Sequence, residues 1–452
     1  MAEPANDDAP RSLTDLLSAA IDAGTLSRAG ALLNTLHPAE IGRLLESLPQ
    51  DQRKLVWGLV AEEQHGEVLL HVNDEVRDSL LRYMDQQALL RAAESMELDD
   101  LADFLQDLPA ALTDAVLRSM DLQHRQRLEA VLAYPEDCAG GLMNPDVITV
   151  PADVSLDVVQ RYLRLRGSLP ELTDRLIVVD RRDRYQGTLS LATLLTHAPE
   201  LPVADVLDQG QAAIPADMPA AEVAKRFADH DWVSAPVVDE HGRVLGRITV
   251  DDVLDVIRDE AEHSIMGAVG LDEEADMFAP VLRSTRRRAI WLGVNLGTAF
   301  LASWVIGLFE DTLQRFVALA VLMPIVASMG GIAGSQTLTL VIRGLALGQV
   351  GGGNVRSLLV KEISIGLLNG LIWAVVVGLV AFAWFRDVEL GLVIGSAMVL
   401  NLFCAALTGV TIPLVLRRFG VDPALAGGMV LTTFTDVVGF LAFLGLATLF
   451  LL

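Results

Sequence analysis

Residues 316–342 read FVALAVLMPIVASMGGIAGSQTLTLVI and contain no charged side chain. A helix needs about 20 apolar residues to cross the hydrocarbon core of a bilayer, which is about 30 Å thick. The chain meets this requirement five times after Arg288, so we expect five membrane helices within residues 283–452 rather than five buried helices of a soluble protein. The other predicted spans are residues 289–309, 363–385, 390–416 and 423–452.

The basic residues beside these spans predict their orientation. Nine of them lie on one side of the membrane and only Arg315 and Arg386 lie on the other. Basic loops are retained in the cytosol, so we expect a cytosolic N-terminus. Because the number of spans is odd, Leu452 then ends outside the cytoplasmic (inner) membrane. The nine residues are Arg283, Arg286, Arg287, Arg288, Arg343, Arg356, Lys361, Arg417 and Arg418.

The formal net charge of −25 on the 452 residues is unevenly distributed, with −29 on residues 1–282 and +4 on the rest. An acidic front half repels phosphate backbones and attracts cations, so we expect no nucleic acid partner. Cys138 and Cys404 are too few and too distant for a disulfide framework. Residues 1–10, MAEPANDDAP, lack the pattern of a signal peptide, which predicts a cytosolic front half.

Asp436 is the only carboxylate deep in the last predicted span. It follows Pro423 by 13 positions, which is about 20 Å along a helix. An ionisable residue at this depth usually faces a helix-bundle interior or water and has a function. The alternative is a protonated acid hydrogen-bonded to a neighbouring helix. Thr432, Thr433 and Thr435 provide hydroxyl groups nearby.

The second span contains Pro324 and the small-residue run MGGIAGSQ at residues 329–336. Two interpretations stay open. Either the helix loosens here and exposes backbone carbonyls to a wet cavity, or Gly330 and Gly334 let neighbouring helices pack closely. Three asparagines that lie singly within spans are expected to form interhelical hydrogen bonds, with no further role assigned. They are Asn295, Asn369 and Asn401.

The membrane half offers oxygen ligands and a single thiol, because all eight histidines lie before residue 283. Carboxylate, hydroxyl, amide and carbonyl oxygens suit a hard cation such as Mg²⁺ and disfavour zinc or copper. Because Mg²⁺ sheds its waters reluctantly, a pore would hold the hydrated ion with several carboxylates. One aspartate per chain cannot form a ring, so the hypothesis requires a symmetric dimer with Asp436 of both chains at the axis.

Residues 139–260 contain an internal repeat. PAD at 151–153 recurs at 215–217, VVD at 178–180 recurs at 237–239, and GTLS at 187–190 corresponds to GRIT at 246–249. Each copy predicts a helix, a short apolar strand, a turn, a second strand and a closing helix. The pair resembles tandem CBS domains, which are α/β regulatory modules that often bind adenine nucleotides.

The second copy carries Thr249 and Asp252 at the spacing that this family uses to bind a ribose, whereas the first has Ser190 and Thr193 and lacks the acid. The resemblance therefore implies at most one site for ATP or another adenine nucleotide. The alternative is a pair that only transmits conformational change.

The first 135 residues contain a weaker repeat, in which Ile41, Leu44, Leu45 and Leu48 recur as Leu101, Phe104, Leu105 and Leu108. This spacing predicts amphipathic helices and hence a stacked all-α domain. Its acidic surface includes Asp99, Asp100 and Asp103, which singly are most simply solvated charges. A helix rich in carboxylates is expected to begin near Asp251 and to lead to the first span. It could couple cation binding in the cytosolic half to the membrane helices.

Taken together, the chain resembles the MgtE family of magnesium channels over nearly its whole length. The motifs that carry the resemblance are YPEDCAGGLM at 134–143, Gly330-Gly331 through Gln336, GVDPAL at 420–425 and TDVVG at 435–439. It implies a multidomain membrane protein with a superhelical N-terminal domain. The implied parts are residues 1–135 (helical domain), 136–200 and 201–258 (CBS domains), 251–280 (connecting helix) and 283–452 (five membrane helices).

The resemblance further implies a homodimer whose axial pore uses spans two and five, with Asp436 as the selectivity carboxylate. Cytosolic Mg²⁺ would bridge the helical domain, the CBS pair and the connecting helix and close the pore. Asp422 would meet the connecting helix at the inner mouth. Pore-lining residues would be Gly330, Gly331, Ser335, Gln336, Gly428 and Thr432, and sensing ligands would be Asp99, Asp100, Asp231, Asp252, Asp255, Asp259 and Glu260.

The sequence departs from the common family pattern at several of these positions. Ile332 and Ser335 replace asparagines in span two, and Gly428 replaces a frequent asparagine, which bears on ion discrimination. His263 and Ser264 replace an acidic pair at the end of the connecting helix, which would raise the Mg²⁺ needed for closure or add a pH dependence.

Two other functions are weighed against a Mg²⁺-selective, Mg²⁺-gated uptake channel. One is a broader divalent carrier that also passes Co²⁺ or Mn²⁺. The other is a membrane-anchored nucleotide sensor without transport. An enzyme is not expected, because the sequence has no Gly-x-x-x-x-Gly-Lys loop and no recognisable catalytic triad.

Overall fold

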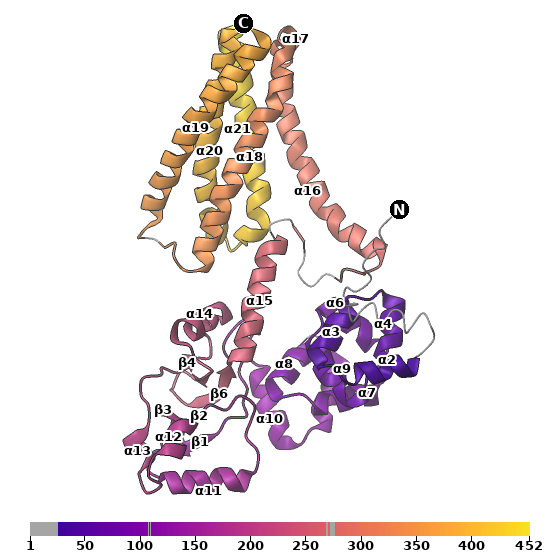
Figure 1. The fold of residues 1–452 in the computed structure, drawn as a ribbon, viewed down its shortest axis with the longest axis vertical. Helices are drawn as coiled ribbons and strands as arrows, with labels where there is room; N and C mark the ends of the chain where they lie inside the picture. The colour runs from indigo at the N-terminus through magenta and orange to yellow at the C-terminus, as the bar shows by residue number, and fades with distance from the viewer. Residues whose placement is uncertain (1–25, 107, 109, 268–269, 272–275, 352) are drawn as a thin grey trace, which may run out of the picture. The chain divides into compact units, whose positions relative to one another are not determined.

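The computed structural model describes residues 26–106, 108, 110–267, 270–271, 276–351 and 353–452. The expectation about residues 1–10 therefore lies outside the described residues. The chain forms two compact units. The first comprises residues up to Ala261 together with the short segment 276–279, and the second comprises residues from Glu262 onward without that segment. Figure 1 gives the helix and strand labels used below.

The described part of the N-terminal domain contains helices and no strand, as predicted. Several begin at a side chain that caps the free backbone N–H groups of the first turn: Asn73 caps α6, Asp85 caps α7, and Asp121 caps α10. The helices and the 3-10 turn are α2 (Leu26–Leu33), α3 (Pro38–Glu46), α4 (Gln50–Trp57), η1 (Glu62–Gln64), α5 (His65–Leu70), α6 (Asp74–Leu81), α7 (Gln86–Glu94), α8 (Leu98–Gln106), α9 (Ala110–Ser119) and α10 (Leu122–Val131).

The predicted amphipathic repeat corresponds to α3 and α8. The apolar residues of both helices are buried, including Ile41 and Leu45 at 0% exposure and Leu105 at 1%, and all belong to one core. That core continues into the second CBS domain through Val223, Phe227 and Val237. The helical domain and the second CBS domain therefore share a hydrophobic core within the first unit.

The repeat at 139–260 forms two three-stranded sheets of the same topology. In each, a short first strand pairs in parallel with the second, and the third pairs antiparallel with the second. The strands are β1 (Thr149–Pro151), β2 (Arg175–Val179), β3 (Tyr185–Ser190), β4 (Ile214–Pro215), β5 (Ser234–Val238) and β6 (Val244–Thr249). The helices are α11 (Leu156–Arg166), α12 (Leu191–Thr196), α13 (Val203–Val206), α14 (Ala220–His230) and α15 (Val250–Gly267).

The YPEDCAGGLM motif is a tight connection between the helical domain and the CBS pair. A side chain at Gly140 would collide with the Tyr134 ring, and one at Gly141 would collide with the Pro135 carbonyl oxygen. The backbone N–H groups of Ala139 and Gly140 donate to the carbonyls of Met218 and Ala216, both at 2.8 Å. The two glycines are therefore required by close packing.

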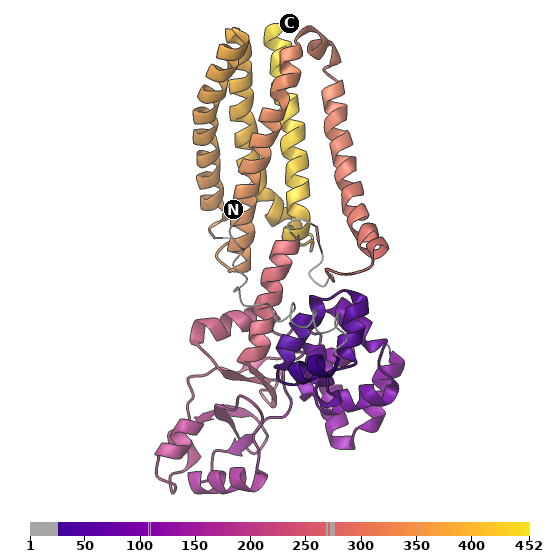
Figure 2. The ribbon, with the colours of Figure 1, turned by 45° about the vertical axis from the view of Figure 1, so that its right-hand side comes forward.

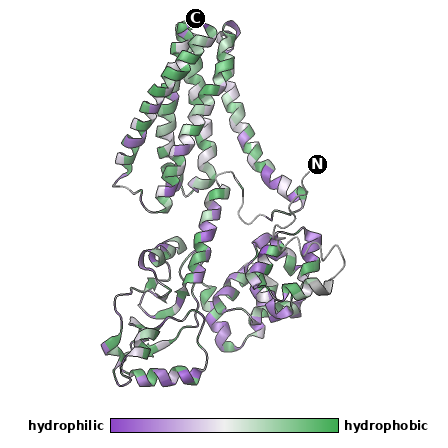
Figure 3. Ribbon diagram, in the orientation of Figure 1, coloured by the Kyte–Doolittle hydropathy of each residue, from purple (hydrophilic) through white to green (hydrophobic). Residues whose placement is uncertain are grey.

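The second unit contains five helices that are long and apolar enough to cross a membrane, which confirms the predicted number among the described residues. They are α16 (Val281–Gly307), α18 (Val317–Ala346), α19 (Val355–Phe385), α20 (Val388–Arg418) and α21 (Pro423–Leu451), with the short α17 (Glu310–Arg315) between the first two. Hydropathy colouring shows apolar residues along most of their length (Figure 3).

Helix α20 lies at the centre of this bundle and packs along α18, α19 and α21. Glycines allow its close approach to α19: an added side chain at Gly378 would lie 3.0 Å from the Gly391 carbonyl oxygen. The two helices run side by side in both ribbon views (Figures 1 and 2). In contrast, most side chains of α16 are exposed in the protomer.

Candidate cation-binding sites

A groove on the membrane unit collects most of the predicted pore residues. Its volume is about 760 Å³, and its lining comes from α18 and α21 alone. Asp436 is the one carboxylate among the lining residues and shares the groove with hydroxyl and amide side chains. The lining residues are Ala327, Ser328, Gly331, Ile332, Ser335, Gln336, Thr339, Thr432 and Asp436.

Gly330 does not line this groove, contrary to the prediction. It is buried, and a side chain there would collide with the amide group of Asn401 on α20. Gly334 similarly faces Leu431, which would lie 3.0 Å from an added Cβ atom. The run 329–336 therefore divides between two faces of α18, with Gly330 and Gly334 on the packed face and Gly331 and Ser335 on the groove face.

Helix α18 continues without a break through Pro324 and this run. The interpretation in which the helix loosens and exposes its carbonyls is therefore wrong for this structure, and the close-packing interpretation holds. Gly428 is not among the groove-lining residues, but its carbonyl oxygen accepts a hydrogen bond from the Thr432 hydroxyl at 2.9 Å. It thus lies one turn from the groove on α21.

Asn401 forms the expected interhelical hydrogen bond. Its Nδ2 donates to the Val326 carbonyl oxygen on α18 at 2.7 Å, and its side chain is fully buried. Gly439 of α21 also packs against this amide, at 2.8 Å from an added Cβ atom. Asn401 therefore joins α18, α20 and α21 behind the groove. Asn295 and Asn369, by contrast, are exposed on α16 and α19.

The membrane unit also contains a buried carboxylate that was not among the predicted site residues. Glu362 on α19 is 4% exposed, and its Oε2 accepts a long hydrogen bond of 3.4 Å from the Thr337 hydroxyl on α18. Its Oε1 lies 3.5 Å from the Lys361 ammonium. Because Lys361 precedes it at the start of a span, the pair has the sequence pattern of an interfacial ion pair rather than of a buried acid.

Asp422 and His263 are brought together within the second unit. The Asp422 side chain caps α21, accepting from the Ala424 N–H at 2.9 Å through Oδ1. Its Oδ2 lies 2.7 Å from Nε2 of His263, near the end of α15. The last turns of the connecting helix are therefore held against the start of the helix that carries Asp436.

A second group of carboxylates lies in the first unit, where α8 meets the start of α15. Asp99 is 7% exposed, and Asp100 and Asp252 are half-buried. Burial and the neighbouring carboxylates Asp99, Asp103, Glu97 and Asp251 raise the pKa of Asp100 to about 8. Burial and the carboxylates Asp99 and Asp251 also raise the pKa of Asp252 to about 8.

Burial likewise raises the pKa values of Asp99 and Glu97. This carboxylate cluster, comprising Glu97, Asp99, Asp100, Asp251 and Asp252, holds more negative charge than its surroundings stabilise. Like charges placed this closely favour either protonation or a bound cation. Within the described part of the chain, however, no three of these groups converge in a ready metal-binding geometry. Glu97 and Asp251 were not among the predicted ligands, although both flank predicted ones.

The other predicted sensing residues do not belong to this cluster. Asp255 and Asp259 flank Arg258, whose guanidinium lies 2.9 Å and 3.3 Å from their carboxylates. Burial raises the pKa of Asp255, an effect that Arg258 partly opposes. Asp231 ends α14 in a left-handed conformation, with φ of 52°. Glu260 is exposed on α15.

Thr249 and Asp252 lie together, as the predicted ribose site requires. The Thr249 hydroxyl donates to Asp252 Oδ2 at 3.1 Å and also to Asp251, and the Thr249 N–H donates to the same Oδ2 at 3.2 Å. Asp252 thus belongs to both predicted sites. In the first CBS domain, Ser190 and Thr193 are also joined, with their hydroxyl oxygens 2.8 Å apart.

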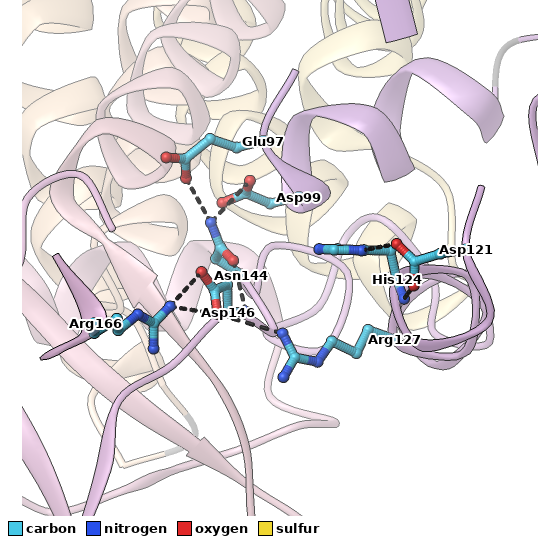
Figure 4. A network of polar contacts seen from close by, with 8 residues as sticks. All are labelled: Glu97, Asp99, Asp121, His124, Arg127, Asn144, Asp146 and Arg166. Carbon is cyan, nitrogen blue, oxygen red and sulfur yellow. Dashed lines mark hydrogen bonds and ion pairs between the residues drawn. The ribbon is translucent and has the colours of Figure 1, made fainter. Parts of the chain in front are cut away.

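A polar network holds α8 against the loop that enters the CBS pair. Asn144, which is 2% exposed, donates from Nδ2 to Glu97 at 2.6 Å and to Asp99 at 3.2 Å. Figure 4 shows this amide pointing at the two carboxylates, with Asp146 on its other side. Asp146 in turn accepts from Arg166 at 2.9 Å. The buried amide, which was not among the predicted site residues, therefore holds Glu97 and Asp99 of the cluster in place.

Comparison with known families supports each part of this arrangement. The sequence pattern of the MgtE intracellular N domain matches residues 36–137, and the CBS domain pattern matches residues 139–200 and 203–259. The MgtE pattern, described as a divalent cation transporter, matches residues 323–446. The magnesium transporter MgtE of Thermus thermophilus is 34% identical over 441 residues, covering 96% of this chain and 98% of that protein.

The chain belongs to the MgtE family. A second MgtE relative, the magnesium transporter MgtE of Bacillus subtilis, is 28% identical over 423 residues, which is 93% of each chain. Among solved structures, the cytosolic domain of an MgtE Mg²⁺ channel in complex with ATP is similar over 54% of this chain and all of that one, with 34% identity and a TM-score of 0.49. The predicted family is confirmed by the sequence relatives, and the predicted fold class by the matched domain patterns and the five apolar helices.

Proposed function

We propose that this MgtE family member is a Mg²⁺-selective channel for magnesium uptake across the cytoplasmic membrane and that cytosolic Mg²⁺ closes it. The observation that carries the proposal is the groove, which places one carboxylate among hydroxyl and amide oxygens along two membrane helices. Oxygen ligands suit Mg²⁺. The relatives named as magnesium transporters cover almost the whole chain.

The pore would form between two copies of the chain. An open groove lined by α18 and α21 presents Asp436 on a surface, so a second copy related by two-fold symmetry would enclose the groove and supply a second carboxylate. Two carboxylates flanked by Ser335, Gln336 and Thr432 could hold a hydrated ion through its water shell. This assignment includes a cytosolic N-terminus and an external C-terminus.

Closure would depend on the carboxylate cluster of the first unit. A divalent cation bound between α8 and the start of α15 would neutralise the repulsion between Asp99, Asp100 and Asp252. Helix α15 then leads to the contact between His263 and Asp422 at the foot of α21. Loss of the cation would restore the repulsion and release α15. Asp231, Asp255, Asp259 and Glu260 stay proposed as secondary ligands.

An adenine nucleotide such as ATP is proposed as a second cytosolic ligand at Thr249 and Asp252. Because Asp252 also belongs to the carboxylate cluster, nucleotide and cation would share this residue. Binding of one would then alter the affinity for the other by the same factor in both directions. Isothermal titration with ATP, at low and high Mg²⁺, would test this linkage.

The deciding experiment measures Mg²⁺ flux into proteoliposomes while Mg²⁺ on the cytosolic face is varied. The variants are Asp436→Asn and Asp436→Glu, with Glu389→Gln as a matched control, since Glu389 is an exposed membrane-unit carboxylate outside the groove. Wild type should conduct at low cytosolic Mg²⁺ and close as it rises, and flux through Asp436→Asn should be about a hundredfold lower. Unchanged flux in Asp436→Asn would refute the pore assignment.

Two outcomes would favour the other functions. If Co²⁺ or Mn²⁺ enters as readily as Mg²⁺ in competition assays, the chain is a broader divalent carrier. If no ion passes while the protein binds an adenine nucleotide tightly, it is a membrane-anchored sensor.

A further inference from the structure

Arg53 on α4 is an arginine with no exposed surface, and its partner lies 223 positions away in the sequence. Its Nη1 and Nη2 donate to Oδ2 and Oδ1 of Asp276 at 2.8 Å and 2.9 Å, which is a bidentate pair. Asp276 is itself only 6% exposed. This ion pair therefore lies inside the first unit and not on its surface.

The rest of the guanidinium is also occupied. Its Nε donates to the Leu45 carbonyl oxygen at 2.9 Å, and Nη2 donates to the Leu48 carbonyl oxygen at 3.1 Å. These two carbonyls belong to the end of α3 and the loop after it, so the helical domain itself orients Arg53. The arginine is thus held ready to receive a carboxylate.

The backbone around Asp276 is bound as well. The Asp276 N–H donates at 2.8 Å to Oε2 of Glu75, a 7%-exposed residue on α6, and the Phe278 N–H donates to Asp276 Oδ1 at 2.9 Å. Residues 276–279 accordingly group with the first unit, although α16 begins at Val281. A short segment before the first span is therefore seated on the helical domain through its contacts with Arg53 and Glu75.

The ion pair is satisfied when the segment is seated, because the two buried charges then compensate each other. Removing one partner by substitution leaves the other charge buried without compensation, which is strongly unfavourable. Asp276 and Val281 are five residues apart, a reach of at most about 18 Å. The seated segment therefore limits how far the start of α16 can move from the helical domain.

We propose that Arg53 and Asp276 form a latch through which the N-terminal helical domain acts directly on the first membrane helix, in addition to its action through α15. The proposal rests on the gated transport proposed above. It assigns α16 a part in closure: the seated latch restrains the helix, and opening requires the segment 276–279 to separate from Arg53 and Glu75. Neither residue belongs to the groove or to the carboxylate cluster.

The test uses the full chain in proteoliposomes with Arg53→Met, Asp276→Asn and the double variant. The matched control is Arg125→Met with Glu129→Gln, an exposed ion pair of the same domain. Each latch variant should raise the cytosolic Mg²⁺ needed for half-closure about tenfold, within the usual range of coupling between sites. The double variant should shift it no further than the larger single one, because both changes break one interaction.

Two measurements separate the latch from a merely structural role. Maximal flux at low Mg²⁺ should equal that of wild type, and Asp276→Glu should recover part of the shift by restoring the charge. Hydrogen exchange of a peptide covering residues 276–279 should be slow in closed wild type and fast in Asp276→Asn, while peptides of α3 and α4 stay protected. Protection lost throughout the helical domain would mean that Arg53 serves folding alone.

The outcomes also distinguish this proposal from the one on which it rests. Wild type without Mg²⁺-dependent flux would refute the gated channel. Wild type that closes normally, together with an Asp276→Asn variant that closes at the same Mg²⁺ concentration, would refute the latch alone.

Discussion

The groove and the carboxylate cluster both contain carboxylates, but the groove has few and the cluster has many. The groove has a single carboxylate, Asp436, among neutral oxygens, whereas the cluster crowds Asp99, Asp100 and Asp252 together with further acids. Conduction needs sites that an ion can leave, and sensing needs sites that retain it. In the proposed mechanism, the same cation is the transported ion at the groove and the regulatory signal at the cluster.

The two sites also differ in what supports them. Behind the groove, Asn401 and closely packed glycines fix α18 against α20 and α21 without any charge. Around the cluster, Asn144 binds Glu97 and Asp99, and Thr249 binds Asp251 and Asp252. Arginines bind acids beside the cluster, such as Asp146 and Asp255. We therefore expect the groove to keep its shape and the cluster to change its structure when its charge changes. The predictions below test this contrast in order of expected size.

The largest effect is expected in the groove. Asp436→Asn keeps the size of the side chain but removes its charge, so flux should fall about a hundredfold, equivalent to about 2.7 kcal/mol in the barrier. The cytosolic Mg²⁺ required for closure of any residual flux should not change. A flux assay with Glu389→Gln alongside provides the comparison, and a change in closure without a change in maximal flux would contradict the division of roles.

The reverse pattern is expected in the cluster. Asp252→Asn removes one of the crowded charges, so maximal flux should stay within twofold of wild type while the Mg²⁺ needed for closure rises about tenfold. Asp205→Asn on α13 is a control in the same CBS pair and lies outside the cluster. Equal closure curves for both variants would remove the cluster from the gating mechanism.

The cluster should also make stability depend on pH. The pKa values of Asp100 and Asp252 are raised to about 8 in the folded chain, so the folded state binds more protons than the unfolded state between about pH 4 and 8. Without divalent cations, the folding stability should therefore fall as pH rises through this range. Above pH 8 the whole of this loss of stability should be present.

Calorimetry or intrinsic fluorescence would test this pH effect by measuring the melting temperature at several pH values. We expect the cation-free cytosolic transition to drop by about 4 °C or more between pH 6 and 9. Saturating Mg²⁺ should reduce the drop, because it binds the deprotonated cluster. A cation-free melting temperature that rises over this interval would contradict the raised pKa values.

The smallest effect is expected at the foot of α21. His263→Ala removes one half-exposed partner of Asp422, and exposed polar pairs contribute about 1 kcal/mol or less. The Mg²⁺ needed for closure should rise no more than about fivefold, which flux measurements at a fixed pH would detect. A larger shift than in Asp252→Asn would move the main control point from the cluster to this contact.

Much of the architecture could be predicted from two kinds of sequence pattern: repeated motifs and long stretches without charged residues. Five long apolar stretches predicted the five membrane helices, and paired motifs predicted the two CBS domains. The strands β1 and β4 escaped prediction because they are only three and two residues long, and both end in proline. Such short strands are stabilised by pairing with a neighbouring strand. They are too short to show an alternation of apolar and polar residues in the sequence.

The candidate sites were predictable only in part for a different reason. Helical spacing puts Thr432 and Asp436 on one face, but it does not show which face of α18 packs. Gly330, which the family resemblance implied to line the pore, lies on the packed face. Glu362 was missed because its burial comes from another helix. Asn144 and Asp276 are ordinary polar residues in sequence, and only the tertiary structure shows their buried partners.

The 223-residue separation between Arg53 and Asp276 has a consequence for biosynthesis. Domains generally fold as they leave the ribosome, which adds about 5–20 residues each second. Asp276 is therefore made about 10–45 s after Arg53, which lacks this counter-charge during that interval. Translation of the linker before the first span then supplies the carboxylate that completes the ion pair.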